Sequence, residues 1–173
     1  MTESRVVAQS VFQLLLAEAL SSVEASVSEE STEAQTQAVE TKIEELGHGV
    51  GYRFMERSAQ TGMLSAEPLE VIKTALCIQF WTEVFGKKID KLQTNHRGVF
   101  VLKDNDFKWL ARYSASDEVV SLAGQRLLKF PCGLIRGALE NLGIHSTVSA
   151  EIESEVKAER RAVKFHISLS SIG

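Results

Sequence analysis

Two pairs of glycines, each spaced four residues apart, constrain the fold of this chain more than any other feature. The first pair, Gly47 and Gly51, lies in LGHGVGYRFMER. Glycine clusters can cradle phosphate, but such loops follow a strand, and no strand pattern precedes this one. An apolar helical period instead runs through the cluster: Val39, Ile43, Leu46, Val50 and Phe54. The period predicts one helix whose bare glycine face lets a second helix approach closely.

The second pair, Gly133 and Gly137, repeats this spacing in PCGLIRGALENL. Proline suits a first helical turn, so we expect one helix to end near Leu128 and another to begin at Pro131. The second should stop at Gly143 and bury Leu134, Ile135, Ala138, Leu139 and Leu142. Each interior glycine costs a helix about 0.5–1 kcal/mol relative to alanine, which close packing can offset. Replacing Gly51 with Leu should therefore overpack the contact by about 1–3 kcal/mol.

The segment from about Ser4 to Val27 also has a helical pattern, with an unusually wide apolar arc. Its apolar residues are Val7, Val11, Phe12, Leu14, Leu15, Leu16, Ala19, Leu20 and Val23. They cover well over half of the circumference, whereas a surface helix has a stripe somewhat wider than 100°. One side can pack on the protein's own core, and the other indicates a partner. We therefore expect the isolated protein to be dimeric or prone to associate.

The order of the remaining patterns predicts the fold class. After the acidic segment 28–37, read as a solvated loop, and the glycine helix, a further helix is expected from Pro68 to Gly86. A short hairpin should follow around an Asp104–Asn105 turn. Segments 144–153 and 162–170 alternate and predict a second hairpin, with Val163, Phe165, Ile167 and Leu169 on one side. Helices, hairpin, helix and hairpin indicate an α+β fold with an antiparallel sheet, in one domain over residues 1–173.

Charge and composition exclude several classes of protein. The net charge of −4 argues against a nucleic-acid binder, which usually carries a basic excess. No apolar run approaches the length of a membrane span, and the first residues do not resemble a signal peptide, so a cytosolic protein is expected. Cys77 and Cys132 lie among apolar neighbours and are expected to be inert buried thiols, in preference to a disulfide or a redox pair.

Residue patterns for catalysis are missing from the sequence. It contains no nucleophile elbow and no P-loop, and its four histidines are too scattered to indicate a metal site. Asp104 and Asp106 are more typical of a hairpin tip than of an acid–base pair. We therefore predict no catalytic residue, no cofactor and no metal.

A basic cluster surrounds His96 and consists of Lys87, Lys88, Lys91 and Arg97. The cluster has two interpretations. It could meet an acidic partner or an anionic lipid surface. Solvated lysines at a helix end are the favoured interpretation.

Two long blocks resemble a known family: FWTEVFGKKIDKLQTNHRGVFVLKDNDFKWL (80–110) and CGLIRGALENLGIHSTVSAEI (132–152). They are similar to the small subunits of the transport protein particle (TRAPP), at the branch of subunit 6. Gly47-x-x-Val50-Gly51 and Glu56-Arg57 also match a helix of that family. The resemblance covers nearly the whole chain from the first helix onward, and the acidic loop 28–37 is the divergent part.

The resemblance implies the Bet-type fold, a four-stranded antiparallel sheet packed with about four to five helices. It implies a non-catalytic structural subunit of a vesicle-tethering complex, cytoplasmic and peripheral at Golgi and endoplasmic reticulum membranes. The whole assembly is a nucleotide-exchange factor for a Rab-type GTPase, so this chain would meet the GTPase and the membrane surface only indirectly.

The resemblance also implies pairing with paralogous TRAPP subunits, chiefly the palmitoylated core paralogue, as a heterodimer; a homodimer is possible in isolation. The candidate partner interface consists of Val7, Val11, Leu14, Leu15, Leu46, Val50 and Phe54. The core paralogue is acylated on a cysteine just before its third helix. This chain has TGMLSAEP there, so acylation at that position is not expected.

Two other classes of function stay open at this point. The same fold occurs in small-molecule sensor domains, including haem-binding ones, for which His145 and His166 are the candidate axial ligands. Both lie in strand patterns, where an ordinary satisfied histidine is the favoured interpretation; a Soret band or a co-purifying ligand in the purified protein would favour the sensor reading. A free-standing enzyme is the third reading, against which the missing site patterns count.

Overall fold

The computed structural model describes residues 14–19, 21–22, 25, 33–58, 67–95, 97–110, 118–153 and 162–170. The chain divides into two compact units, Met1–Ile43 and Glu44–Gly173. In the first unit, residues 14–19, 21–22 and 25 are helical, within the segment where the first helix is predicted. Helix α2 (Glu33–Ser58) begins in the first unit and continues into the second. The single domain over residues 1–173 stays a prediction.

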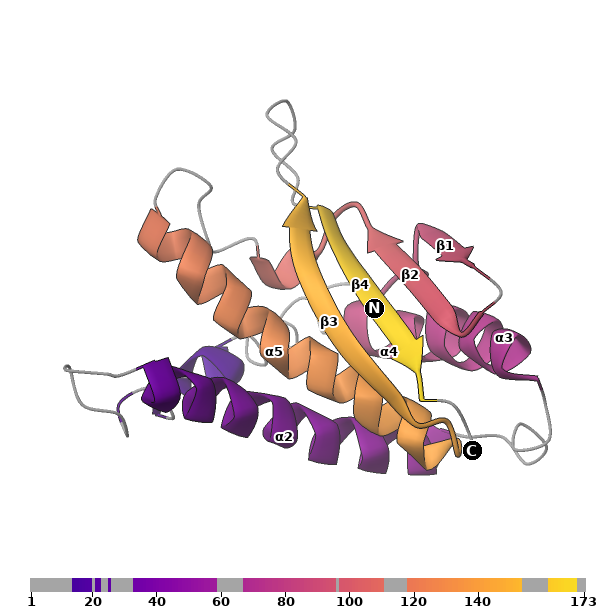
Figure 1. Cartoon of the computed structure of the whole chain (residues 1–173), viewed down its shortest axis with the longest axis horizontal. Coiled ribbons are helices and arrows are strands. Elements are labelled where there is room, and N and C mark those ends of the chain that lie inside the picture. The colour runs from indigo at the N-terminus through magenta and orange to yellow at the C-terminus, as the bar shows by residue number, and fades with distance from the viewer. Residues whose placement is uncertain are drawn as a thin grey trace, which may run out of the picture. The chain divides into compact units, whose positions relative to one another are not determined.

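The second unit contains a four-stranded antiparallel sheet in the order β1-β2-β4-β3. Its elements after α2 are α3 (Pro68–Val71), η2 (Ile72–Phe80), α4 (Trp81–Phe85), β1 (Lys91–Thr94), β2 (Val99–Asp104), η3 (Lys108–Leu110), α5 (Glu118–Asn141), β3 (Ser146–Glu153) and β4 (Ala162–Leu169). Figure 1 shows the four strands side by side, with β3 at one edge and β1 at the other. The predicted α+β class with an antiparallel sheet is confirmed.

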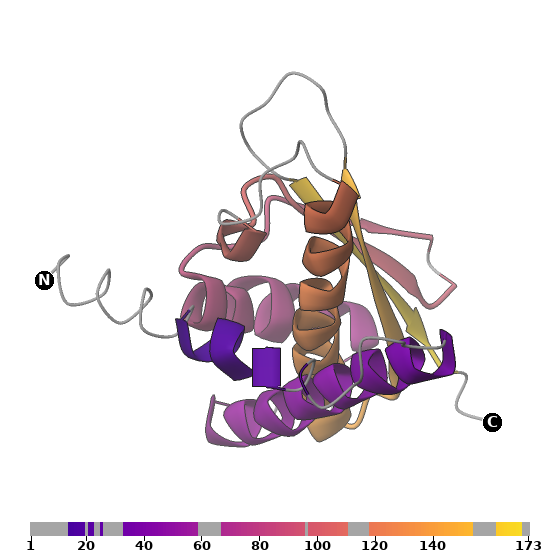
Figure 2. The ribbon, with the colours of Figure 1, turned by 90° about the vertical axis from the view of Figure 1, so that its left-hand side faces the viewer.

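The helices α3, α4 and α5 lie on one face of the sheet (Figure 2). Strand residues alternate between the two faces, so every second residue of β2 and β4 is buried against these helices. The buried set is Phe100, Leu102, Val163, Phe165 and Ile167. The outer face carries the alternate residues of these strands, among them Lys103, Lys164 and His166, and is not covered by any described helix of this unit.

Helices α3, η2 and α4 form one continuous helical segment from Pro68 to Phe85, as predicted. Pro68 occupies the first turn, and Gly86 ends the segment with a left-handed φ of 77°. The aromatic residues of its last turns anchor the core. The Trp81 ring lies 4.5 Å from the Phe85 ring and 5.4 Å from the Phe165 ring of β4.

The predicted hairpin turn at Asp104–Asn105 is wrong. The hairpin instead joins β1 to β2, and its turn lies between Asn95 and Val99, whose backbones are hydrogen-bonded. The Asn95 side-chain oxygen accepts hydrogen bonds from the backbone N–H groups of Arg97 and Val99, at 2.8 and 3.1 Å. Asn favours turns through such local bonds, and Gly98 supplies the positive φ of 85°.

The predicted helix break at Pro131 is also wrong, because α5 continues through it from Glu118 to Asn141. A proline inside a helix costs about 3 kcal/mol. The helix is buried on both sides of this position, including Leu127, Leu128, Leu134 and Ile135, and this burial offsets the cost. The predicted stop at Gly143 is confirmed, since Gly143 has a φ of 79° and the Ile144 N–H donates to the Leu139 carbonyl at 2.9 Å.

Candidate functional site

The glycine pairs are the two halves of one helix–helix contact between α2 and α5. A Cβ at Gly51 would overlap the carbonyl oxygen of Leu134 and lie 2.7 Å from its carbon. A Cβ at Gly47 would overlap the carbonyl oxygen of Phe130. The predicted close approach of a second helix to the glycine face is confirmed, since each backbone occupies the space of a missing side chain.

The glycines of α5 make the same contact from the other side. A Cβ at Gly133 would lie 2.8 Å from the backbone nitrogen of His48. One at Gly137 would lie 2.9 Å from the backbone nitrogen of Tyr52. These faces are therefore occupied by helix backbone and are not available as a phosphate-binding loop.

This contact determines which side chains of α2 are exposed. The row Gly47, Gly51 and Met55 is buried, whereas Leu46 and Val50 are 43% and 42% exposed. The predicted stripe from Val39 to Phe54 is therefore not one buried face. Because the glycine side of α2 faces α5, the neighbouring residues Leu46 and Val50 point away from the core.

The exposed apolar row of α2, defined as Leu46 and Val50, is the part of the predicted partner interface that this unit leaves open. Phe54 is half-buried, and its ring meets the ring of Phe80 edge-on at 5.6 Å. Phe54 therefore also packs within the chain. Tyr52, which the sequence analysis did not select, is also 40% exposed, but the helical period places it on the other side of the glycine row from Leu46 and Val50.

The predicted interface residues of the first unit are described only in part. Leu14 and Leu15 are 54% and 68% exposed. Val7 and Val11 lie outside the described residues. The assignment of these four residues to an interface stays a prediction.

A histidine–glutamate hydrogen bond and an arginine–glutamate ion pair also link α2 to α5. His48 Nε2 lies 2.6 Å from Glu140 Oε2, and Arg136 Nε lies 3.3 Å from Glu44 Oε1. The hydrogen bond with His48 holds the pKa of Glu140 below its ordinary value. The exposed row therefore belongs to a helix that is held by both backbone packing and charge.

Asp104 forms a buried polar cluster that the sequence analysis missed. It is 1% exposed and accepts hydrogen bonds from Trp81 Nε1 at 3.0 Å and from the Asp106 N–H at 2.9 Å. Lys87 Nζ lies 2.6 Å from Asp104 and 2.7 Å from Asp90. A buried tryptophan usually needs an acceptor for its indole N–H. Trp81 in an apolar helix therefore indicated that a polar residue would be buried beside it. Asp104 is thus a structural residue at the end of β2.

The basic cluster predicted around His96 is dispersed. Burial opposes the charge of Lys87, but its hydrogen bonds to Asp104 and Asp90 outweigh burial and raise its pKa. Lys88 and Arg97 are exposed on the two connections that flank β1, and Lys91 lies on β1 itself. Only Lys91 belongs to the outer face of the sheet.

The remaining candidate residues have ordinary surroundings. Cys77 and Cys132 are free and buried, as predicted, and burial raises the pKa of each thiol to about 12. His145 is exposed, and His166 on β4 lies 3.2 Å from Glu151 on β3. Within the described part of the chain, no group of three or more metal-ligating side chains gathers.

None of the described helices combines the length and the apolar character that crossing a bilayer requires.

Comparisons with known proteins place these features in a family. Residues 12–170 match the family described as "Transport protein particle (TRAPP) component". Trafficking protein particle complex subunit 6B of Homo sapiens is 38% identical over 164 residues, which cover 95% of this chain and 98% of that protein. Subunit 6b of Danio rerio is 39% identical over 83% of this chain and 88% of its own length.

A solved structure agrees with the fold. Trafficking protein particle complex subunit 3 from Naegleria fowleri, covalently bound to palmitic acid, superposes with a TM-score of 0.67 at 13% identity. The superposition covers 95% of this chain and 96% of that one. At this identity the likeness shows the fold alone. The sequence match over residues 12–170 shows more: this chain belongs to the TRAPP component family.

Proposed function

We propose that this chain is a non-catalytic structural subunit of a TRAPP vesicle-tethering complex, in the position of subunit 6. The proposal is supported by similarity over almost the full length of subunit 6B. The complex would act in endoplasmic reticulum-to-Golgi and Golgi traffic, with this subunit cytoplasmic and peripheral at both membranes. The chain would support Rab-GTPase nucleotide exchange by the whole assembly without supplying a catalytic residue.

Within that assembly the chain pairs with the palmitoylated core paralogue. The observation that carries this proposal is the exposed row Leu46 and Val50, on a helix that α5 already holds in place. Interface centres are depleted in charge and enriched in such apolar side chains. The proposed interface adds Val7, Val11, Leu14, Leu15 and Phe54. The acyl chain belongs to the partner, because TGMLSAEP in this chain contains no cysteine.

The test is Val50→Asp, measured as the dissociation constant for the subunit 3-type paralogue of the same organism. An unpaired carboxylate buried at an interface costs several kcal/mol. At about 1.4 kcal/mol per tenfold, this predicts at least a hundredfold weaker binding. Leu15→Asp tests the first helix in the same way. Ile78→Asp is the matched control, since Ile78 is 43% exposed on η2, and it should bind like wild type.

Circular dichroism separates loss of binding from loss of folding. Near-wild-type spectra with failed binding support the interface. Unfolding of the Leu15→Asp protein would assign Leu15 to the intrachain core, and full binding by a folded Val50→Asp protein would remove α2 from the interface. A Soret band in the wild-type protein would instead favour the haem-sensor alternative.

A further inference from the structure

The outer face of the sheet carries three lysines in one cross-strand row. Lys91 on β1 pairs in register with Lys103 on β2, which pairs with Lys164 on β4. Like charges directly opposite each other on a sheet are destabilising. This face is not covered by a described helix of the unit (Figure 2). The charge of the row must therefore be compensated by other groups on the same face.

Carboxylates of β3 compensate two of the three lysines. Glu153 lies 2.5 Å from Lys103 Nζ and 2.9 Å from Lys164 Nζ. The hydrogen bond from Lys103, followed by that from Lys164, holds the pKa of Glu153 below its ordinary value. Glu151 adds a contact at 3.9 Å to Lys164. The β3 side of the row thus shows how a carboxylate fits between two of these lysines.

Among the described residues, the β1 side of the row has no such carboxylate. Lys91 is exposed, and in the described part of the chain it forms no ion pair. The nearby carboxylate of Asp90 is engaged by Lys87 at 2.7 Å and by the Asn105 N–H at 2.7 Å. Lys91 is therefore the cation of this row that the side chains described by the structure leave uncompensated.

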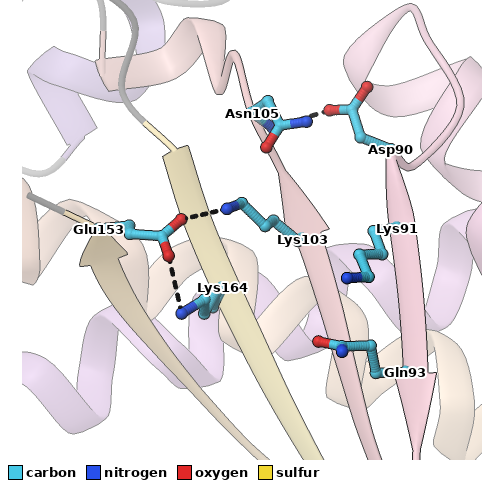
Figure 3. A pocket seen from close by; sticks show the side chains of 7 residues that line it. All are labelled: Asp90, Lys91, Gln93, Lys103, Asn105, Glu153 and Lys164. Atoms are coloured by element: carbon cyan, nitrogen blue, oxygen red, sulfur yellow. Dashed lines mark hydrogen bonds and ion pairs between the residues drawn. The ribbon is translucent and has the colours of Figure 1, made fainter. Parts of the chain in front are cut away.

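A pocket of about 470 Å³ opens at this position. Figure 3 shows Lys91 and Gln93 along β1, facing Lys103 on β2, with Glu153 and Lys164 beyond. Asp90 and Asn105 complete the lining. The pocket thus combines the uncompensated ammonium group of Lys91 with that of Lys103, which is already paired with Glu153. The side-chain amides of Gln93 and Asn105 can donate hydrogen bonds in the same pocket.

We propose that this pocket binds a carboxylate side chain of an acidic segment from a partner protein. The carboxylate would lie between Lys91 and Lys103, as Glu153 lies between Lys103 and Lys164. The amides of Gln93 and Asn105 would bond the segment's backbone. A single negative charge matches the one uncompensated cation. A multiply charged phosphate or lipid headgroup fits less well, because Asp90 and Glu153 stand at the walls and would repel it.

This site is formed by β1, β2, β3 and β4, away from the exposed row of α2. The proposal therefore does not depend on how the chain pairs with a paralogue. If the α2 experiments fail, the pocket proposal still stands. If the pocket experiment fails, the proposed α2 interface still stands.

The test measures fluorescence anisotropy of the full chain with a fluorescein-labelled peptide of alternating Glu and Ser at low ionic strength. The control peptide has Gln in place of Glu. Lys91→Gln should weaken binding of the acidic peptide about tenfold, the order expected for one charge-assisted hydrogen bond, and Lys91→Arg should restore most of it. Lys73→Gln is the matched control, since it removes the same charge from an exposed pair on η2 and should bind like wild type.

Thermal unfolding provides a second readout. Removing Lys91 relieves repulsion in the row, so the Lys91→Gln protein should unfold no earlier than wild type while it binds more weakly. Equal loss in the Lys91→Gln and Lys73→Gln proteins would overturn the proposal, as would equal binding of both peptides or no binding by wild type. Lys91-dependent binding to vesicles with phosphatidylinositol 4-phosphate, without binding of the acidic peptide, would overturn it in favour of a lipid headgroup.

Discussion

At the scale of single residues, substitutions at Gly51 and Gly49 distinguish the contribution of helix packing to stability from that of helix propensity. Both lie in α2, but a Cβ at Gly51 would overlap the Leu134 carbonyl, while one at Gly49 would meet nothing within 4 Å. Gly51→Ala should therefore destabilise the fold by about 1–3 kcal/mol through overpacking. Gly49→Ala should stabilise it by about 0.5–1 kcal/mol. Urea unfolding of both variants measures the difference, and stabilisation by both would contradict the close contact.

Asp104 offers a second prediction at the same scale. Asp104→Ala leaves the indole N–H of Trp81 without its acceptor, which costs about 1–3 kcal/mol for a buried donor. At about 2–4 °C per kcal/mol for a chain of this size, the melting temperature should fall by several degrees. Asp106→Ala is the control, because the Asp106 side chain is exposed. Equal melting temperatures for the two variants would show that the buried cluster contributes nothing.

At the scale of elements, the contact between α2 and α5 should depend on pH through Glu140. The hydrogen bond with His48 lowers the pKa of Glu140. A lowered pKa contributes stability above the ordinary glutamate value of about 4.3, and the contribution is lost as pH falls through the lowered pKa. Because the Glu140 side chain is 41% exposed, the effect should be only about 0.2–1 kcal/mol.

Unfolding free energies of wild type and Glu140→Gln between pH 3 and 7 check this prediction. The two curves should differ near pH 6 and converge toward pH 3. Glu56→Gln, which removes a charge from an exposed position of α2, should keep the wild-type slope. A constant offset between wild type and Glu140→Gln at every pH would exclude the ionised pair as the cause.

Elements whose ends are marked locally could be predicted from the sequence. Gly86 and Gly143 stop helices in left-handed backbone, and the alternation of Val163, Phe165 and Ile167 gives the buried face of β4. The position of the hairpin turn and the continuity of α5 could not be predicted from the sequence. Local rules favour a turn at Asp104–Asn105 and a break at Pro131. Tertiary burial of Asp104 against Trp81, and of α5 on both sides of Pro131, overrides them.

The candidate sites show the same limit. The glycine spacing indicated a helix contact, but which helix fills it follows only from the fold. Leu46 and Val50 were selected as interface residues, while the rotation of α2 that exposes them depends on Gly47 and Gly51 facing α5. The lysine row was not predicted, because its three members come from three strands that are brought into register only by the sheet.

At the scale of the whole molecule, we propose that two surfaces of this chain bind other proteins. The apolar row of α2 would face a paralogue, and the lysine row of the sheet would face an acidic segment. The buried thiols and the charged pairs act within the fold. Membership of the TRAPP component family and the exposed apolar side chains both favour assembly of this chain with other subunits.

Sedimentation velocity of the wild-type chain mixed with the subunit 3-type paralogue of the same organism tests that claim most directly. We expect one species with the mass of a 1:1 heterodimer across micromolar concentrations, and self-association of the chain when it is alone. Two separate species in the mixture, with this chain a monomer at every concentration, would contradict it.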